Sequence, residues 1–105
     1  MPNGHDKNFM RLRWACAEYR QAHKEWPTEA RMDASILWDL AHLFDSNQFQ
    51  SLASRIRIRT RDKSGLSVGG ARGVVEYGTG AGVDEETLEL TERWLGVQPL
   101  PEEEL

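Results

Sequence analysis

The chain has 105 residues, 39% of them hydrophobic, and a formal net charge of −4 at pH 7. This length allows one domain with one modest core and excludes two independent domains. No apolar run approaches the roughly 20 residues of a membrane span, and the N-terminus has no apolar stretch typical of a secretory signal. A single cysteine, Cys16, excludes an internal disulfide. These features predict a cytoplasmic protein that does not contact a membrane.

The charge is unevenly distributed along the chain. Residues 55–72 carry six Lys or Arg against one Asp, whereas residues 73–105 carry one Arg against nine acidic residues. Three of those acids lie in the last seven residues, which predicts a single domain over residues 1–98 followed by an acidic tail at residues 99–105.

The first half of the chain has helical periodicity. A first helix is predicted over residues 7–25, because apolar residues recur there at steps of three and four and Pro27 should end the element. A second helix follows Thr28 or Asp33, either of which could be its N-cap. Residues 45–47 interrupt its apolar pattern and predict a short third helix capped by Ser46, although one bent helix is the alternative.

The period then changes to two. Residues 55–61 read RIRIRTR, which predicts a half-buried strand with arginines on one face and Ile56, Ile58 and Thr60 on the other. Turn residues at 62–65 and 69–72 separate it from strands at residues 66–68 and 73–77. The simplest arrangement is a three-stranded antiparallel meander.

A last helix is predicted from the N-cap Asp84 to Gly96. The predicted fold class is therefore α+β: two or three N-terminal helices, the meander, and a C-terminal helix packed on one face of the sheet.

The glycine-rich segment after the third strand resembles a phosphate-binding loop only superficially. The spacing is Gly78-x-Gly80-x-Gly82, and Asp84, Glu85 and Glu86 place negative charge where phosphates would lie. We interpret the segment as a turn and predict no cofactor. His5, His23 and His42 are too scattered to predict a metal site, and Cys16 is expected to be a buried structural residue.

The predicted arginine row is the strongest functional signal. Arg55, Arg57, Arg59 and Arg61 would project from one strand face about 7 Å apart. Such a row could bind an acidic protein, follow the phosphates of a nucleic acid, pair across the hairpin or with the acidic last helix, or lie in solvent. The acidic chain and the lack of interleaved aromatic residues disfavour nucleic acid.

Trp14 and Trp38 lie off the main apolar stripes of their helices, whereas Trp26 and Trp94 lie on or near predicted core positions. Trp14 and Trp38 are therefore candidates for exposed aromatic contacts with a partner, although small cores also use large side chains.

These patterns predict a small non-enzymatic interaction protein of the adaptor or inhibitor type, monomeric or weakly dimeric, that binds an acidic partner through the arginines, Trp14 and Trp38. The alternative is a nucleic-acid-binding module that uses the same arginines. An enzyme is less favoured, because no acid–base pair, nucleophile pair or metal cluster can be assembled from the spacing.

Overall fold

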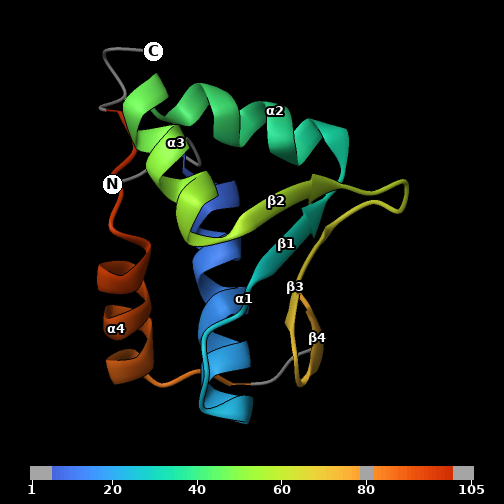
Figure 1. The fold of residues 1–105 in the computed structure, drawn as a ribbon, viewed down its shortest axis with the longest axis vertical. Helices are drawn as coiled ribbons and strands as arrows, with labels where there is room; N and C mark the ends of the chain where they lie inside the picture. Colours follow the sequence, from blue (N-terminus) through green and yellow to red (C-terminus); the bar gives the residue numbers. More distant parts are fainter. Residues whose placement is uncertain (1–5, 79–81, 101–105) are drawn as a thin grey trace.

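The described residues form four helices and a four-stranded mixed sheet (Figure 1). The structure is a computed structural model that describes residues 6–78 and 82–100. In chain order the elements are α1 (Lys7–His23), β1 (Glu29–Met32), α2 (Ala34–Leu43), α3 (Ser46–Arg55), β2 (Arg57–Thr60), β3 (Leu66–Gly70), β4 (Gly73–Glu76) and α4 (Glu85–Leu95). The predicted α+β class is confirmed.

The predicted three-stranded antiparallel meander is wrong. The strand order is β2-β1-β3-β4, with β1 parallel to β2 and antiparallel to β3. The chain therefore crosses over through α2 and α3 between two parallel strands, and the loop after β2 passes the end of β1. Only β3 and β4 form the predicted antiparallel hairpin.

Strand β1 has no counterpart among the predicted elements, because residues 29–32 fall between Thr28 and Asp33, the two candidate N-caps of the second helix. The strand has four residues, Glu-Ala-Arg-Met, and alanine has a low preference for strands. Its alternation is nevertheless complete, because Ala30 and Met32 are fully buried while Arg31 is exposed. The strand is stable because it has a hydrogen-bonded neighbour on both sides.

The predicted helix boundaries are right to within a few residues. Helix α1 ends at His23 rather than residue 25, because Lys24 adopts a left-handed conformation (φ 61°) and donates its N–H to the carbonyl of Arg20. The break between α2 and α3 is confirmed, but the α3 N-cap is Asp45 and not Ser46.

Two other predicted caps are confirmed. Asp33 caps α2, and its carboxylate accepts a hydrogen bond from the N–H of Ile36. Asp84 caps α4 in the same way, and Gly96 ends that helix in a left-handed conformation (φ 69°).

The helices lie in layers around one core. Helix α1 packs against β3 and β4, and α4 packs against α1 in Figure 1, so the predicted packing of the last helix on the sheet is corrected. Buried side chains from α1, α2, α3 and the sheet form one cluster, which includes Leu12, Tyr19, Met32, Leu40 and Val68. The opposite face of the sheet, called the open face below, is exposed to solvent at Arg31, Arg57, Arg59 and Val74.

A buried tyrosine joins α1 to the β3–β4 hairpin. The Tyr19 hydroxyl donates to Glu25 (2.8 Å) and accepts from the backbone N–H of Arg72 (3.1 Å). It lies directly beside Gly70, where a Cβ atom would be only 2.5 Å from the Tyr19 oxygen. Glycine is therefore needed at position 70 by this close approach.

We expect Gly70→Ala to lower the free energy of unfolding by about 1–3 kcal/mol, because Tyr19 must move and its two hydrogen bonds are strained or lost. Thermal denaturation measures the effect. Gly82→Ala is the matched control, since a Cβ atom there meets nothing within 4 Å. The double variant Gly70→Ala/Tyr19→Phe should lose less stability than the two single variants added together, because the hydroxyl that clashes is gone. An unchanged melting temperature in Gly70→Ala contradicts the prediction.

Candidate functional site

The open face brings arginines from two strands together. Strand alternation places Arg57 and Arg59 of β2 on it, and the parallel register places Arg31 of β1 beside Arg59 and Glu29 beside Arg57. We call Arg31, Arg57 and Arg59, with Glu29 among them, the arginine face. Neighbouring strands are about 4.8 Å apart, so these side chains form a two-dimensional cluster and not only a row.

Glu29 holds two of these arginines. Its Oε2 accepts from the Nε of Arg31 at 2.6 Å, and its Oε1 is 3.1 Å from the Nε of Arg59. The hydrogen bond from Arg31 is the main reason that the pKa of Glu29 is lowered, so this carboxylate stays ionised at neutral pH. The Arg57 side chain is exposed and has no ion-pair or hydrogen-bond partner in the part of the chain that the structure describes. The arginine face therefore carries three positive charges and one negative charge.

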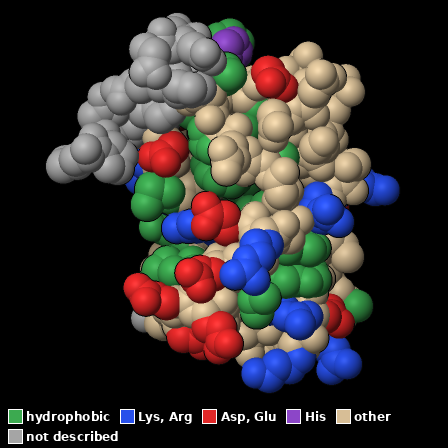
Figure 2. Space-filling view, turned by 90° about the vertical axis from the view of Figure 1, so that its left-hand side faces the viewer, with side chains coloured by type: hydrophobic (Ala, Val, Ile, Leu, Met, Phe, Trp, Pro, Cys, Tyr) green, Lys and Arg blue, Asp and Glu red, His purple; other side chains and the backbone are tan. Residues whose placement is uncertain are grey.

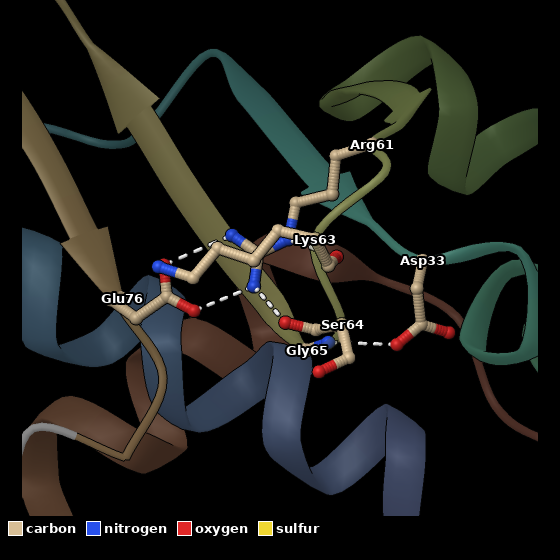
Figure 3. Close-up of polar contacts among 6 residues, drawn as sticks. All are labelled: Asp33, Arg61, Lys63, Ser64, Gly65 and Glu76. Atoms are coloured by element: carbon tan, nitrogen blue, oxygen red, sulfur yellow. Dashed lines mark hydrogen bonds and ion pairs between the residues drawn. The ribbon is translucent and has the colours of Figure 1, made fainter.

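Arg61, also predicted to belong to the row, has a structural role instead. Figure 3 shows its guanidinium reaching across to Glu76 of β4. Two hydrogen bonds of 2.9 and 2.6 Å join the pair, and Arg61 also donates to the carbonyls of Lys63 and Ser64. Its side chain is only 13% exposed. The guanidinium lowers the pKa of Glu76, and the carboxylate raises the pKa of Arg61.

Asp33 anchors the same loop from its other side. Its carboxylate accepts from the N–H of Gly65 at 2.7 Å (Figure 3). It also accepts from the N–H of Ile36 at 3.0 Å and from the hydroxyl of Ser35 at 2.7 Å. These hydrogen bonds, that of Gly65 first, lower the pKa of Asp33 to about 2. Asp33 therefore ties the start of α2 to the start of β3.

Arg55 does not belong to the arginine face. It is the last residue of α3, and Ile56 separates it from β2. The strand expected from residue 55 therefore begins two residues later. The prediction failed there because the arginine–isoleucine alternation starts inside the last turn of the helix.

The two candidate tryptophans differ in exposure. Trp38 on α2 is 67% exposed, and its ring is 4.1 Å from that of His42, centroid to centroid. Trp14 on α1 is half-buried, so it is not the fully exposed contact that was considered. Trp26 and Trp94 are also half-buried and stack on each other at 4.5 Å, as expected for structural residues.

The arginine face is separate from the acidic last helix, so the predicted alternative of pairing between the two is wrong. Glu29 and Glu76 are the partners of the predicted row, and the α4 glutamate in an ion pair is Glu92, with Arg13. In Figure 2, which faces the side of the molecule that carries α4, acidic side chains gather at the lower left and Lys or Arg at the lower right.

Two hollows adjoin Arg31. The larger, about 560 Å³, lies over β1, β3 and β4, and Glu29, Arg61, Glu76 and the glycines at 69 and 70 are among the residues that line it. The smaller, about 470 Å³, is lined by Arg31, Leu37, Ile58, Arg59 and Thr60. It therefore offers two guanidinium groups, one hydroxyl and two apolar side chains, without a carboxylate.

Cys16 and His23 lie on α1, and His42 lies on α2. Cys16 is buried, and burial raises the pKa of its thiol far above the usual range. His23 lies against the ring of Tyr19. Residues 6–78 and 82–100 contain no cluster of three or more side chains that could bind a metal, and none of their helices is long and apolar enough to cross a membrane. Gly80 of the glycine-rich segment lies outside the described residues.

Sequence reasoning missed Arg31 and Glu29 as members of the site. The available signal was the period-two pattern Glu29-Ala30-Arg31-Met32, which matches the pattern of residues 55–61 in miniature. Its position beside β2 could not be inferred, because the two strands are 24 residues apart in the sequence and pair through a crossover.

No protein-family model matches the chain, and no curated protein or solved structure is detectably similar to it. The geometry of the site is therefore the basis for assigning a function.

The low pKa of Asp33 leads to a prediction about stability in acid. A carboxylate whose pKa is lower in the folded than in the unfolded state stabilises the fold above its ordinary pKa, and this contribution is lost as the pH falls. We expect Asp33→Asn to lower the melting temperature at neutral pH. The difference from wild type should shrink as the pH falls from about 4 to about 2.

Asp62→Asn is the control, because it removes an exposed carboxylate from the same loop. Melting curves across this pH range give the comparison. A constant difference between wild type and Asp33→Asn at all pH values contradicts the assignment.

Proposed function

We propose that this protein is a small non-enzymatic interaction module that binds an acidic protein partner through the arginine face. The observation that carries the proposal is the excess of positive charge on an exposed sheet face, where Arg31, Arg57 and Arg59 share one carboxylate, Glu29. Complementary charge on the partner would raise the association rate and favour the correct orientation.

The position of β2 supports an extended segment as the binding partner. Strand β2 is at an edge of the four-stranded sheet. Arg57 and Arg61 donate their N–H groups to the carbonyls of Thr28 and Met32, so the alternate residues Ile58 and Thr60 direct their backbone groups away from β1. A partner strand could add to this edge by main-chain hydrogen bonds, with acidic side chains beside Arg57 and Arg59.

A protein partner is favoured over a nucleic acid by the composition of the open face. Single-stranded nucleic acids are usually bound by aromatic rings between basic residues. The open-face positions of the four strands hold arginine, glutamate, serine, glycine and valine and no aromatic residue.

Trp38 supplies a second candidate contact. It lies next to Leu37 in the sequence of α2, and Leu37 lines the smaller hollow together with Arg31 and Arg59. Exposed tryptophans are enriched among residues that dominate binding energies. A partner that bound the β2 edge and extended over α2 would cover this ring.

The proposal is tested with a fluorescein-labelled peptide of alternating valine and glutamate, measured by fluorescence anisotropy at several salt concentrations. We expect Arg57→Glu/Arg59→Glu to weaken binding by about tenfold or more, which corresponds to at least about 1.4 kcal/mol. The melting temperature should change by only a few degrees, because exposed ion pairs contribute roughly 0–1 kcal/mol.

Arg55→Glu/Arg72→Glu is the matched control: it makes the same change in net charge outside the arginine face, at two exposed positions. If both double variants weaken binding equally, overall charge and not the arginine face determines affinity. Single-stranded DNA and RNA of similar length serve as competitors, and displacement by either at lower concentration than the unlabelled peptide favours the nucleic-acid alternative. Sedimentation tests whether the free protein is a monomer or a weak dimer.

A further inference from the structure

We propose that Arg31 and Arg59, held in position by Glu29, form a receptor for a carboxylate side chain of the partner at the smaller hollow. This inference rests on the proposed function and names the chemical group that the arginine face recognises.

Glu29 contacts both arginines near the base of the guanidinium group. Both contacts are made to Nε, at 2.6 Å for Arg31 and 3.1 Å for Arg59. A guanidinium has five N–H donors, and four of them are on the two terminal nitrogens. Those terminal nitrogens donate no hydrogen bond to another residue in the described part of the chain. Glu29 therefore restrains each guanidinium at its stem and leaves its outer donors available.

The two guanidinium groups also lie close to each other. Arg31 and Arg59 are partners in the parallel register of β1 and β2, and both project from the open face. A carboxylate has two oxygens with about four lone-pair sites, so it can accept from two guanidinium groups at once. Planar, bidentate hydrogen bonding of this kind is the geometry in which arginine differs most from lysine.

The smaller hollow is lined by both arginines. Arg31, Arg59 and the hydroxyl-bearing Thr60 line it together with Leu37 and Ile58. Leu37 and Ile58 are partly buried against the core on the other face of the sheet, so the groups that this hollow offers on the open face are the two guanidinium groups. The hollow lies toward the carboxyl ends of the parallel strands β1 and β2, the end of such strands at which ligands commonly bind in open α/β sheets.

Glu29 also favours a carboxylate over a phosphate group. A phosphomonoester carries about −1.5 to −2 charges at neutral pH, whereas a carboxylate carries −1. Arg31 and Arg59 carry two positive charges and Glu29 carries one negative charge, which leaves one net positive charge. A carboxylate matches this charge, whereas a phosphate group would exceed it.

The test uses the same valine–glutamate peptide with Arg31→Lys, Arg57→Lys and Glu29→Gln. We expect Arg31→Lys to weaken binding by about fivefold or more, because lysine keeps the charge but loses the bidentate geometry. Arg57→Lys is the comparison variant, since Arg57 is exposed on the same face and lies outside the smaller hollow, and it should weaken binding less than Arg31→Lys does.

Glu29→Gln distinguishes positioning from simple attraction. The substitution removes a negative charge, so attraction by net charge alone would make the acidic peptide bind more tightly. If Glu29 positions the two arginines, binding should instead weaken by about threefold or more, because the guanidinium groups lose their restraint. Melting temperatures near that of wild type confirm that the variants are folded.

Tighter binding by Glu29→Gln, or equal losses from Arg31→Lys and Arg57→Lys, overturns the receptor. If Arg57→Glu/Arg59→Glu still abolishes binding in that case, the proposed function stands and the face binds by charge alone. A matching peptide with phosphoserine in place of glutamate tests the chemical group, and tighter binding of the phosphoserine peptide overturns the assignment to a carboxylate. If no arginine variant affects binding, the proposed function fails as well.

Discussion

The parallel hydrogen bonding between β1 and β2 is the constraint on which the open face depends. At one end of the ladder the N–H of Arg57 donates to the carbonyl of Thr28, and at the other end the N–H of Arg61 donates to the carbonyl of Met32. These hydrogen bonds set the two strands in register. That register places Arg31 beside Arg59 and brings Glu29 within reach of both. A shift of one residue would turn either strand's arginines toward the core, so the buried Ala30 and Met32 also maintain the site.

The loop between β2 and β3 is secured by charged groups on both sides. Asp33 accepts from the N–H of Gly65, and Glu76 binds the guanidinium of Arg61 with two hydrogen bonds. These contacts hold the loop after β2 against β1, β3 and β4. One of the four arginines predicted as partner-binding is thus used for structure. Within the described residues, the terminal guanidinium nitrogens of Arg31, Arg57 and Arg59 make no such structural hydrogen bonds. A row of arginines in a sequence can therefore contain both residues that stabilise the fold and residues whose side chains are exposed.

The arrangement of the arginines is observed in the fold, whereas binding of a partner is inferred. The fold explains why three arginines stand on one exposed face with a single carboxylate among them, and the binding of an acidic partner is inferred from that charge distribution. The inferred roles also differ within the face. Glu29 restrains the guanidinium groups of Arg31 and Arg59, while Arg57, the partner of Glu29 in the strand register, contributes only charge. This division makes the proposal sensitive to substitutions that preserve charge, and not only to those that reverse it.

Local chemistry was sufficient to predict several elements from the sequence alone. The periodicity of α1, the caps Asp33 and Asp84, the C-terminal Gly96 and the β3–β4 hairpin depend on residues within a few positions of one another. Tertiary structure alone decided the sheet order, the burial of Trp14 and the partners of Arg59 and Arg61. The sheet order and the pairing of Arg59 with Glu29 depend on β1, a four-residue strand that lies between two strands distant in the sequence, and periodicity carries no information about which strands will meet.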